Sequence, residues 1–166
     1  MPVATPRNLA LVAFAVALAT IAGAWAFEIF GGFVPCELCY LQRWPYYIGL
    51  PVLALALLAW PRLPRLFKLA LIIIATAIFV WSTYLGAYHA GVEWAFWPGP
   101  TSCTGLGEAI GFDQLSNLDA QRIVPCDRPQ IRIFGLSFAG WNALISAGVT
   151  VLLGGAMLGL ARAANS

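Results

Sequence analysis

The chain has 166 residues, of which 61% are hydrophobic and only 10% are charged, with a mean hydropathy of +0.82. Soluble domains carry roughly 25% charged residues, so this composition excludes a water-solvated globule and indicates a membrane protein. The formal net charge of +2 says little by itself, and we predict no nucleic-acid partner.

Four apolar segments each approach or exceed the roughly 20 residues that a helix needs to cross a bilayer. They lie at about residues 8–30, 44–60, 66–89 and 136–161. In lipid, backbone polar groups must be satisfied within the segment, so these segments must be helices. The sequence therefore predicts an all-α membrane protein, a bundle of four transmembrane helices that forms one domain over residues 1–166.

The first span also has features of a cleaved signal peptide, namely Arg7, an apolar stretch and small residues at 22–24. The apolar stretch, however, continues as far as Phe30, beyond the usual length of a signal sequence. Cleavage would also leave three spans, which conflicts with the distribution of charge. We therefore expect the first span to be retained.

The charged residues are divided unequally between the two ends of the predicted bundle. One end carries basic residues and no acid: Arg7, Arg62, Arg65, Lys68 and Arg162. The other end carries all seven acids and four arginines. Because basic loops stay in the cytoplasm, we predict that both termini are cytoplasmic and that all four cysteines lie outside.

The long connection between predicted spans, at about residues 91–135, contains Cys103 and Cys126. Connections of this length are usually functional or disordered, and the apolar residues interspersed here argue against disorder. Ser116 lies where it can cap a short helix that runs to Ile123. Because the apolar residues of this helix fall on one side, we predict that it lies on the membrane surface.

Cys36 and Cys39 form a C-x-x-C pair between the first two predicted spans. Thiols at this spacing can alternate between dithiol and disulfide, and here a lipid-soluble electron carrier can reach them. One alternative is a structural disulfide between Cys103 and Cys126 beside an unreactive C-x-x-C pair. Another is a zinc site made of all four cysteines, although structural zinc sites usually repeat the close pairing. We favour electron transfer between thiol pairs and predict no metal.

Pro35 can occupy the first turn of a helix that begins at the C-x-x-C pair. Free N–H groups and the helix dipole there favour a thiolate, whereas Glu37 opposes it. Arg43, four residues after Cys39, can stabilise a Cys39 thiolate or a reduced quinone oxygen. Alternatively, Arg43 extends to the interface as an ordinary membrane arginine. Pro45 can begin a new helix, in which case Cys39 and Arg43 no longer lie one turn apart on the same helix.

His89 closes the third predicted span, one turn before Glu93. A single histidine at a membrane interface is often a hydrogen-bonded anchor. The other interpretation is that His89 hydrogen-bonds the electron acceptor or delivers protons to it.

Several motifs occur together in this chain. They are P-C-E-L-C-Y-L-Q-R at 35–43, Tyr88-His89, the loop cysteines Cys103 and Cys126, and C-D…F-G-L-S…W-N from Cys126 to Asn142. In these motifs, and in its four spans with cytoplasmic ends, the chain resembles the bacterial disulfide bond formation protein B (DsbB) family. The resemblance covers nearly the whole chain, and C-x-x-C-x-x-x-R with two distant loop cysteines is a specific pattern.

The resemblance implies a disulfide oxidoreductase of the bacterial inner membrane whose cysteines face the periplasm and which supports protein disulfide bond formation. It implies that a reduced periplasmic dithiol oxidase of the DsbA type attacks a Cys103–Cys126 disulfide at Cys103. It further implies that Cys126 then passes the electrons to Cys36 and Cys39, each transfer being thiolate attack on a disulfide sulfur.

The resemblance also implies that Cys39 reduces a membrane quinone, either ubiquinone or menaquinone. Arg43 and His89 are then the expected quinone-binding residues. Residue 42 is glutamine, whereas some relatives have an acid before this arginine. A carboxylate role in proton delivery at this position is therefore left open.

Two other functions fit parts of the pattern. A vitamin K epoxide reductase-like enzyme also combines four helices with C-x-x-C and loop cysteines, but its C-x-x-C pair is expected late in the bundle. A membrane scaffold or small transporter with a disulfide-closed loop is the second alternative. Transport would be favoured by ionisable residues inside the spans, and the predicted spans carry none in their interiors.

Overall fold

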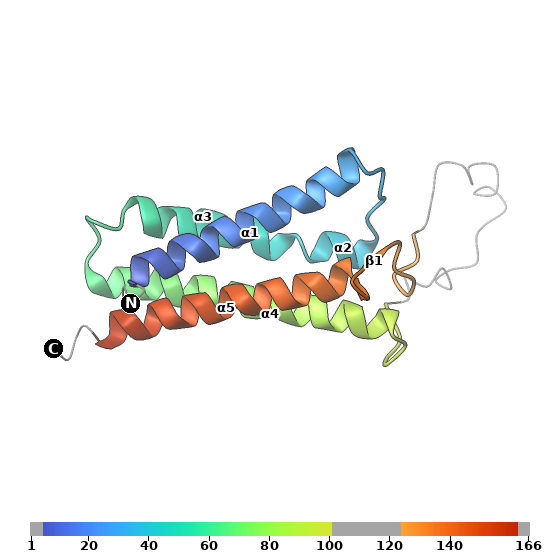
Figure 1. The fold of residues 1–166 in the computed structure, drawn as a ribbon. Helices are drawn as coiled ribbons and strands as arrows, with labels where there is room; N and C mark the ends of the chain where they lie inside the picture. The colour runs from blue at the N-terminus through green and yellow to red at the C-terminus, as the bar shows by residue number, and fades with distance from the viewer. Residues whose placement is uncertain (1–4, 101–123, 163–166) are drawn as a thin grey trace, which may run out of the picture.

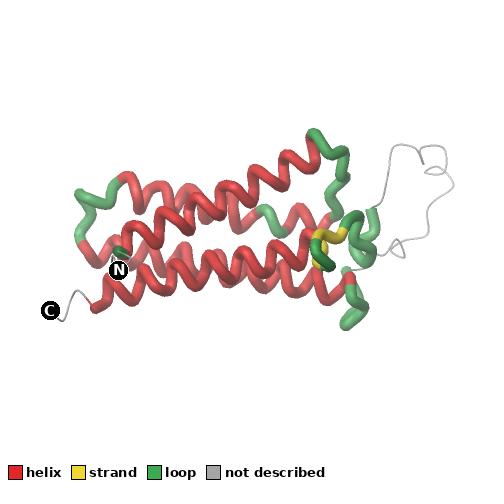
Figure 2. Tube along the Cα trace, viewed as in Figure 1, coloured by secondary structure: helices red, strands yellow, loops and turns green. Residues whose placement is uncertain are grey.

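The protein forms an elongated bundle of helices in a computed structural model that describes residues 5–100 and 124–162 (Figure 1). The long helices are α1 (Pro6–Ile29), α3 (Trp44–Leu58), α4 (Arg65–Glu93) and α5 (Phe138–Arg162). A short helix, α2 (Glu37–Leu41), precedes α3. α1 begins and α5 ends at one end of the bundle, and α2 lies towards the other end (Figures 1 and 2). The mostly helical architecture agrees with the predicted class.

Within the described residues, three helices are long and apolar enough to cross a membrane: α1, α4 and α5. They correspond to the predicted spans at 8–30, 66–89 and 136–161. α3 has 15 residues and is therefore about 22 Å long, less than the roughly 30 Å of the hydrocarbon core. Three spans are thus supported by length and composition, and the fourth stays a prediction.

α2 and α3 are separate helices because of Pro45. Proline has no N–H, and in a continuous helix its ring would collide with the carbonyl of Leu41. The chain instead restarts at Arg43, whose carbonyl accepts a hydrogen bond from the N–H of Tyr46 at 3.0 Å. The predicted interruption is confirmed, and it leaves the C-x-x-C pair on a short helix of its own.

Small residues allow the long helices to approach one another closely. Ala10, Ala13 and Ala17 on α1 have no exposed surface. Between α4 and α5, a Cβ added to Gly86 would lie 2.7 Å from the backbone nitrogen of Ala143, closer than real Cβ contacts. Membrane helices pack in this way because lipid provides no hydrophobic drive between them. The close contact fixes α4 against α5, the two helices that frame the site.

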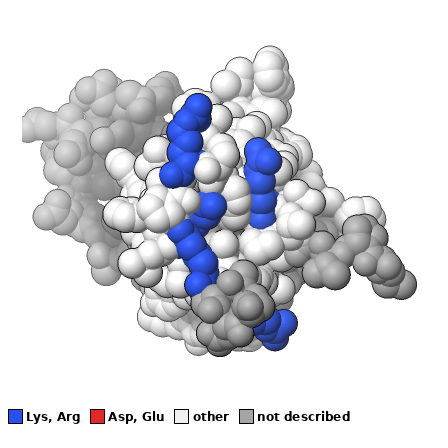
Figure 3. Space-filling model, turned by 90° about the vertical axis from the view of Figure 1, so that its left-hand side faces the viewer, with Lys and Arg blue, Asp and Glu red and all other residues white. Residues whose placement is uncertain are grey.

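The end of the bundle where α1 begins and α5 ends is basic. Figure 3 shows arginine and lysine side chains on this face and no acidic side chain among the described residues in view. At this end, two hydrogen bonds join α4 to α5: the guanidinium of Arg65 donates to the carbonyls of Leu160 and Ala161. The charge asymmetry predicted from the sequence is present in the fold; the side of the membrane that it faces stays a prediction.

The opposite end contains a small hairpin. Its strands are β1 (Arg132–Ile133) and β2 (Leu136–Ser137), paired antiparallel. Phe134 (φ 50°) and Gly135 (φ 83°) both adopt the left-handed conformation that a tight two-residue hairpin turn requires. The indole of Trp141 on α5 donates to the carbonyl of Ile133 at 2.9 Å and holds the hairpin in place. This hairpin was not predicted from the sequence, which indicates helices alone. The predicted helix at 116–123 lies outside the described residues.

Candidate thiol redox site

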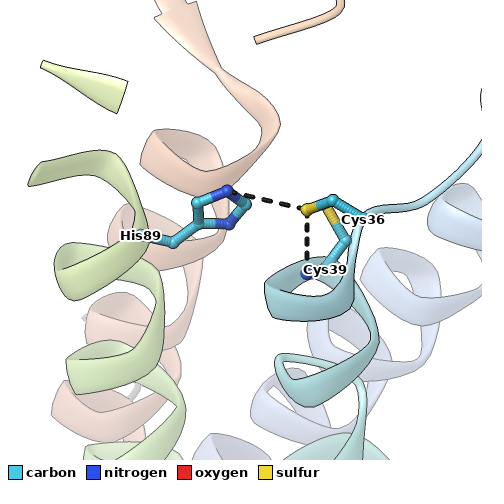
Figure 4. Close-up of side chains that lie close together, drawn as sticks. All are labelled: Cys36, Cys39 and His89. Carbon is cyan, nitrogen blue, oxygen red and sulfur yellow. Dashed lines mark hydrogen bonds between the residues drawn. The ribbon is translucent and has the colours of Figure 1, made fainter. Parts of the chain in front are cut away.

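The C-x-x-C pair begins α2. Cys36 is the N-cap residue, with extended backbone (φ −78°, ψ 172°), and its Sγ accepts a hydrogen bond from the N–H of Cys39 at 3.3 Å. The sulfur replaces the side-chain oxygen that usually caps a helix. Because the helix starts after Cys36, Pro35 precedes the cap, and its predicted place in the first turn was wrong. The two Sγ atoms are 2.7 Å apart and both cysteines are free. Cys36 lies between Cys39 and His89 and faces the histidine ring (Figure 4).

The two thiols hold their protons with unequal strength. Hydrogen bonding from the Cys39 thiol, helped by His89, lowers the pKa of Cys36 to about 5, although burial acts in the opposite direction. The pKa of Cys39 is raised because its proton is held in the hydrogen bond to Cys36, and because it is buried. At neutral pH the reduced pair therefore carries its negative charge on Cys36 and its proton on Cys39.

His89 lies on α4 and is 2% exposed. Its Nε2 is 3.7 Å from Sγ of Cys36 and 3.2 Å from the carbonyl oxygen of Cys126. Its Nδ1 is 2.6 Å from the side-chain nitrogen of Gln42. The imidazole ring is therefore held between the C-x-x-C pair and the segment that follows the long loop.

Cys126 lies beside the C-x-x-C pair. It is 1% exposed and disulfide-bonded, and it packs in one apolar cluster with Cys36, Leu38 and Val92. Its predicted partner, Cys103, lies outside the described residues. The four-cysteine zinc site has no support from this arrangement, because a sulfur in a disulfide is not a thiolate ligand.

The guanidinium of Arg43 is bound from three sides. Its Nη1 is 2.5 Å from Oε2 of Glu28, in the last turn of α1. The rings of Trp25 and Tyr40 face it at 5.4 and 5.2 Å from their centroids, distances typical of cation–π contacts. Arg43 is 7% exposed, so its guanidinium is held inside the protein rather than extended into solvent.

A cavity of about 430 Å³ adjoins these residues. Its volume lies within the range of small-molecule sites. Apolar side chains from α1, α5 and the hairpin form much of its wall, among them Ile21, Phe27, Ile133, Phe138 and Ile145. The polar part of the wall includes four residues singled out from the sequence: Cys36, Cys39, Arg43 and His89. The cavity thus suits an apolar molecule that meets thiols and a cation at one side.

A family model described as Disulfide bond formation protein DsbB matches residues 6–156. The chain belongs to the DsbB family. A curated relative, Uncharacterized protein RP370 of Rickettsia prowazekii (strain Madrid E), is 26% identical over 152 residues, which cover 89% of this chain and 86% of the relative. No solved structure matches. Membership and the three apolar helices identify an inner-membrane protein of disulfide bond formation, with disulfide oxidoreductase activity.

Two carboxylates at this DsbB-family site were not predicted from the sequence to be site residues. Glu28 binds Arg43, and only the packing of α1 reveals this. Glu93 has a side chain that is 5% exposed, with Oε1 at 3.8 Å from Nε2 of His89 and Oε2 without a hydrogen-bond partner among the described residues. Glu93 follows His89 by one helical turn in the sequence, and this spacing could have identified it as a site residue. Both carboxylates line the cavity.

The same site has a set of atoms that could bind a metal ion. The Sγ atoms of Cys36 and Cys39 and a ring nitrogen of His89 lie within 4.8 Å of one another. Soft divalent metals prefer such ligands. However, Nε2 of His89 faces the carbonyl oxygen of Cys126, which can only accept a hydrogen bond. Nε2 therefore carries a proton and has no lone pair for a metal, so the arrangement favours thiol chemistry.

Proposed function

We propose that this DsbB-family protein transfers electrons from a periplasmic dithiol oxidase of the DsbA type to membrane quinone, through Cys103–Cys126 and then Cys36–Cys39. The observation that carries the proposal is the packing of disulfide-bonded Cys126 against Cys36 and His89, at the wall of an apolar cavity. One cysteine from each pair lies at the same buried point, as a relay requires.

In the first step, a thiolate of the reduced partner attacks Sγ of Cys103, and Cys126 leaves as a thiolate. The second thiol of the partner attacks the mixed disulfide, so the partner leaves oxidised and Cys103 is released reduced. Two electrons now reside in the loop pair, and the two protons of the partner's dithiol pass to the loop thiols or to solvent. Each event is a thiol–disulfide exchange.

In the second step, the Cys126 thiolate attacks Sγ of Cys36 in the Cys36–Cys39 disulfide, and Cys39 leaves with the electron pair. Cys103 then attacks Cys126, which restores the loop disulfide and releases Cys36. The shared cluster of Cys126 and Cys36 supports this choice of sulfur. The lowered pKa of Cys36 supports it as well, because a thiol of low pKa is the better leaving group.

The residues around the cavity fit a quinone, which when bound would accept two electrons and two protons. Arg43 presents a fixed cation that can stabilise negative charge on an acceptor oxygen. Cys39 and Cys36 line the same wall, and the pair closes to a disulfide as it gives up its two electrons. Of the two protons required, one comes from the Cys39 thiol and the other from the surroundings.

The proposal includes the orientation in the membrane. The basic end of the bundle, with both termini, faces the cytoplasm, and the end with α2 and the hairpin faces the periplasm. α3, lengthened by the preceding α2 segment, then provides the fourth crossing. The charge asymmetry of the folded chain supports this orientation.

The decisive experiment uses the purified protein with a reduced DsbA-type partner and either ubiquinone or menaquinone analogues. Quinone absorbance and partner thiols are followed together. We expect one quinone reduced for each partner dithiol oxidised, and no turnover by Cys36→Ser or Cys39→Ser in correctly folded protein. Partner oxidation that proceeds in the Cys36→Ser variant at the wild-type rate would contradict the relay.

A further inference from the structure

A continuous set of buried and partly buried hydrogen bonds runs from the site into the middle of the bundle. It joins helices α3, α4 and α5 with Gln42, one of the two residues between α2 and α3. Its members, in order from the site, are His89, Gln42, Asn142, Tyr46, Ser146 and Ser82. We call this set the polar chain.

The directions of the first bonds are fixed by two backbone carbonyls, which can only accept. The side-chain nitrogen of Gln42 is 3.3 Å from the carbonyl of Leu38, so Gln42 donates there and its amide nitrogen faces His89. Nδ1 of His89 must then accept. On the other side of the ring, Nε2 is 3.2 Å from the carbonyl of Cys126, so Nε2 must donate. Both contacts require the same form of the ring, neutral with its proton on Nε2.

The rest of the polar chain is consistent with this form. Oε1 of Gln42 accepts from the amide of Asn142 at 2.7 Å, which leaves Oδ1 of Asn142 to accept from the hydroxyl of Tyr46 at 2.6 Å. The hydroxyl of Ser146 is 2.9 Å from that of Tyr46 and 3.5 Å from Oδ1 of Asn142, and Ser82 is 2.8 Å from Ser146. Because the Tyr46 proton is directed at Asn142, Ser146 donates in this direction and Ser82 donates to Ser146. The side-chain donors that link Ser82 to Gln42 therefore all point towards the histidine.

Burial makes this direction difficult to reverse. Ser82 and Ser146 have no exposed surface, Tyr46 is 2% exposed and Gln42 is 7% exposed. Reversing one amide would place two acceptors or two donors in contact away from water, and a buried polar group without a partner costs about 1–3 kcal/mol. The burial of these groups thus disfavours reversal of the Gln42 amide.

We propose that Gln42 and Asn142 are positioning residues that hold His89 as a neutral ring with its proton on Nε2. Held in this way, the Nε2–H points at the carbonyl of Cys126 and at Sγ of Cys36. It stabilises a Cys36 thiolate by hydrogen bonding, and it does not act as the base that removes a thiol proton. The link to catalysis rests on the proposed function; the form of the ring does not.

The test uses ¹⁵N NMR of the full-length protein labelled with ¹⁵N-histidine and reduced at the C-x-x-C pair, without quinone or partner. His89 is the single histidine of the chain, so its two ring nitrogens give unambiguous signals that distinguish protonated from unprotonated nitrogen. We expect a protonated Nε2 and an unprotonated Nδ1 at neutral pH. A protonated Nδ1 in the wild-type protein would overturn the inference, whatever the variants do.

Gln42→Glu tests the role of Gln42 with little change of shape. Imidazole is a stronger base than a carboxylate, with ordinary pKa values of about 6.5 and 4.3, so the ring should hold a proton on Nδ1 and donate a hydrogen bond from it to the new carboxylate. We expect the Nδ1 signal to change to that of a protonated nitrogen. Retention of the wild-type pattern in folded Gln42→Glu protein would refute the role of Gln42.

Asn142→Leu tests the second positioning residue, because it removes the donor to Oε1 of Gln42. We expect a second set of histidine signals, from rings protonated on Nδ1. The matched control is Ser82→Ala, which removes a hydroxyl at the far end of the polar chain and should leave one set of wild-type signals. One unchanged set in Asn142→Leu would remove Asn142 from the proposal. Wild-type protein with the expected ring form but no quinone reduction would count against the proposed function alone.

Discussion

Arg43 and Glu28 form an ion pair of 2.5 Å that joins the start of α3 to the last turn of α1. The pair fixes the direction of the guanidinium, which also lies against Trp25 and Tyr40. A flexible arginine would lose side-chain entropy on binding an acceptor, whereas this one is already in place at the cavity wall. Any catalytic effect of Arg43 therefore depends on Glu28 as well.

The first prediction concerns the Arg43 cation. Arg43→His should raise the quinone KM or lower kcat by roughly tenfold or more, about 1.4 kcal/mol of lost stabilisation. Arg43→Lys should be milder, because lysine keeps the charge but loses the planar fork that binds Glu28. Steady-state quinone reduction at several quinone concentrations measures both. Unchanged KM and kcat in Arg43→His would show that Arg43 has no catalytic role.

The second prediction concerns Glu28. Glu28→Gln should change quinone kinetics in the same direction as Arg43→Lys, because a neutral amide binds a guanidinium less strongly than a carboxylate does. Glu37→Gln provides the matched control, since it is the same chemical change at an exposed residue of α2. If the two variants behave alike, the ion pair has no part in binding the acceptor.

Much of the fold follows from the sequence because single segments determine it. The apolar runs that become α1, α4 and α5 are long enough to identify by composition alone. The break before α3 follows from Pro45, whose missing N–H and bulky ring act locally. The hairpin was missed because its strands have two residues each and its turn places Phe134, a residue without turn preference, at positive φ.

The site was predictable only in part. The C-x-x-C spacing and the basic residue after it are local features, so Cys36, Cys39 and Arg43 could be singled out as candidates. The partners of these residues come from other helices: the bond from Asn142 to Gln42 joins residues 100 positions apart. The rotation of a helix about its own axis determines which of its side chains face the site. Contacts between helices, such as that of Gly86 with Ala143, fix this rotation. No local pattern in the sequence encodes that rotation.

The third prediction concerns the order of the two cysteine pairs. Cys103→Ala should block oxidation of the partner while the Cys36–Cys39 pair still reacts with quinone. With Cys126→Ala, the Cys103 thiolate can attack the disulfide of the oxidised dithiol oxidase, whose second sulfur leaves as a thiolate. A mixed disulfide between Cys103 and the partner should then be trapped. Mass spectrometry of the trapped complex identifies the bonded cysteine. Trapping on Cys36 or Cys39 alone would reverse the assigned order.

The fourth prediction concerns packing between α4 and α5. Gly86→Ala should destabilise the bundle by about 1–3 kcal/mol, the usual cost of forcing a methyl group into a filled space. The obstacle is backbone of Ala143, which cannot rotate away as a side chain can. Gly23→Ala on α1 is the control, because a Cβ there meets nothing within 4 Å. Unfolding by SDS in mixed micelles, followed by circular dichroism, compares the two; equal stabilities would contradict the close approach.

The last prediction concerns the charge on Cys36. Its pKa is lowered from 9.0 to about 5, so alkylation of Cys36 in the reduced protein should be half-maximal near pH 5 and nearly constant from pH 7 upwards. The unfolded chain binds this proton more strongly than the folded protein does. The reduced protein should therefore gain stability as the pH rises from about 5 to 9, and lose it as the pH falls through about 5. Rates of iodoacetamide labelling, resolved by peptide mass spectrometry, give the titration.

Cys39→Ala is the informative variant for this titration. It removes the hydrogen-bond donor beside Cys36, so the alkylation midpoint should move upwards while His89 keeps it below the ordinary thiol value. An alkylation midpoint near pH 9 in the wild-type protein would mean that Cys36 is an ordinary thiol. The choice of Cys36 as the sulfur attacked by Cys126, and released as the leaving thiolate, would then lose its chemical basis.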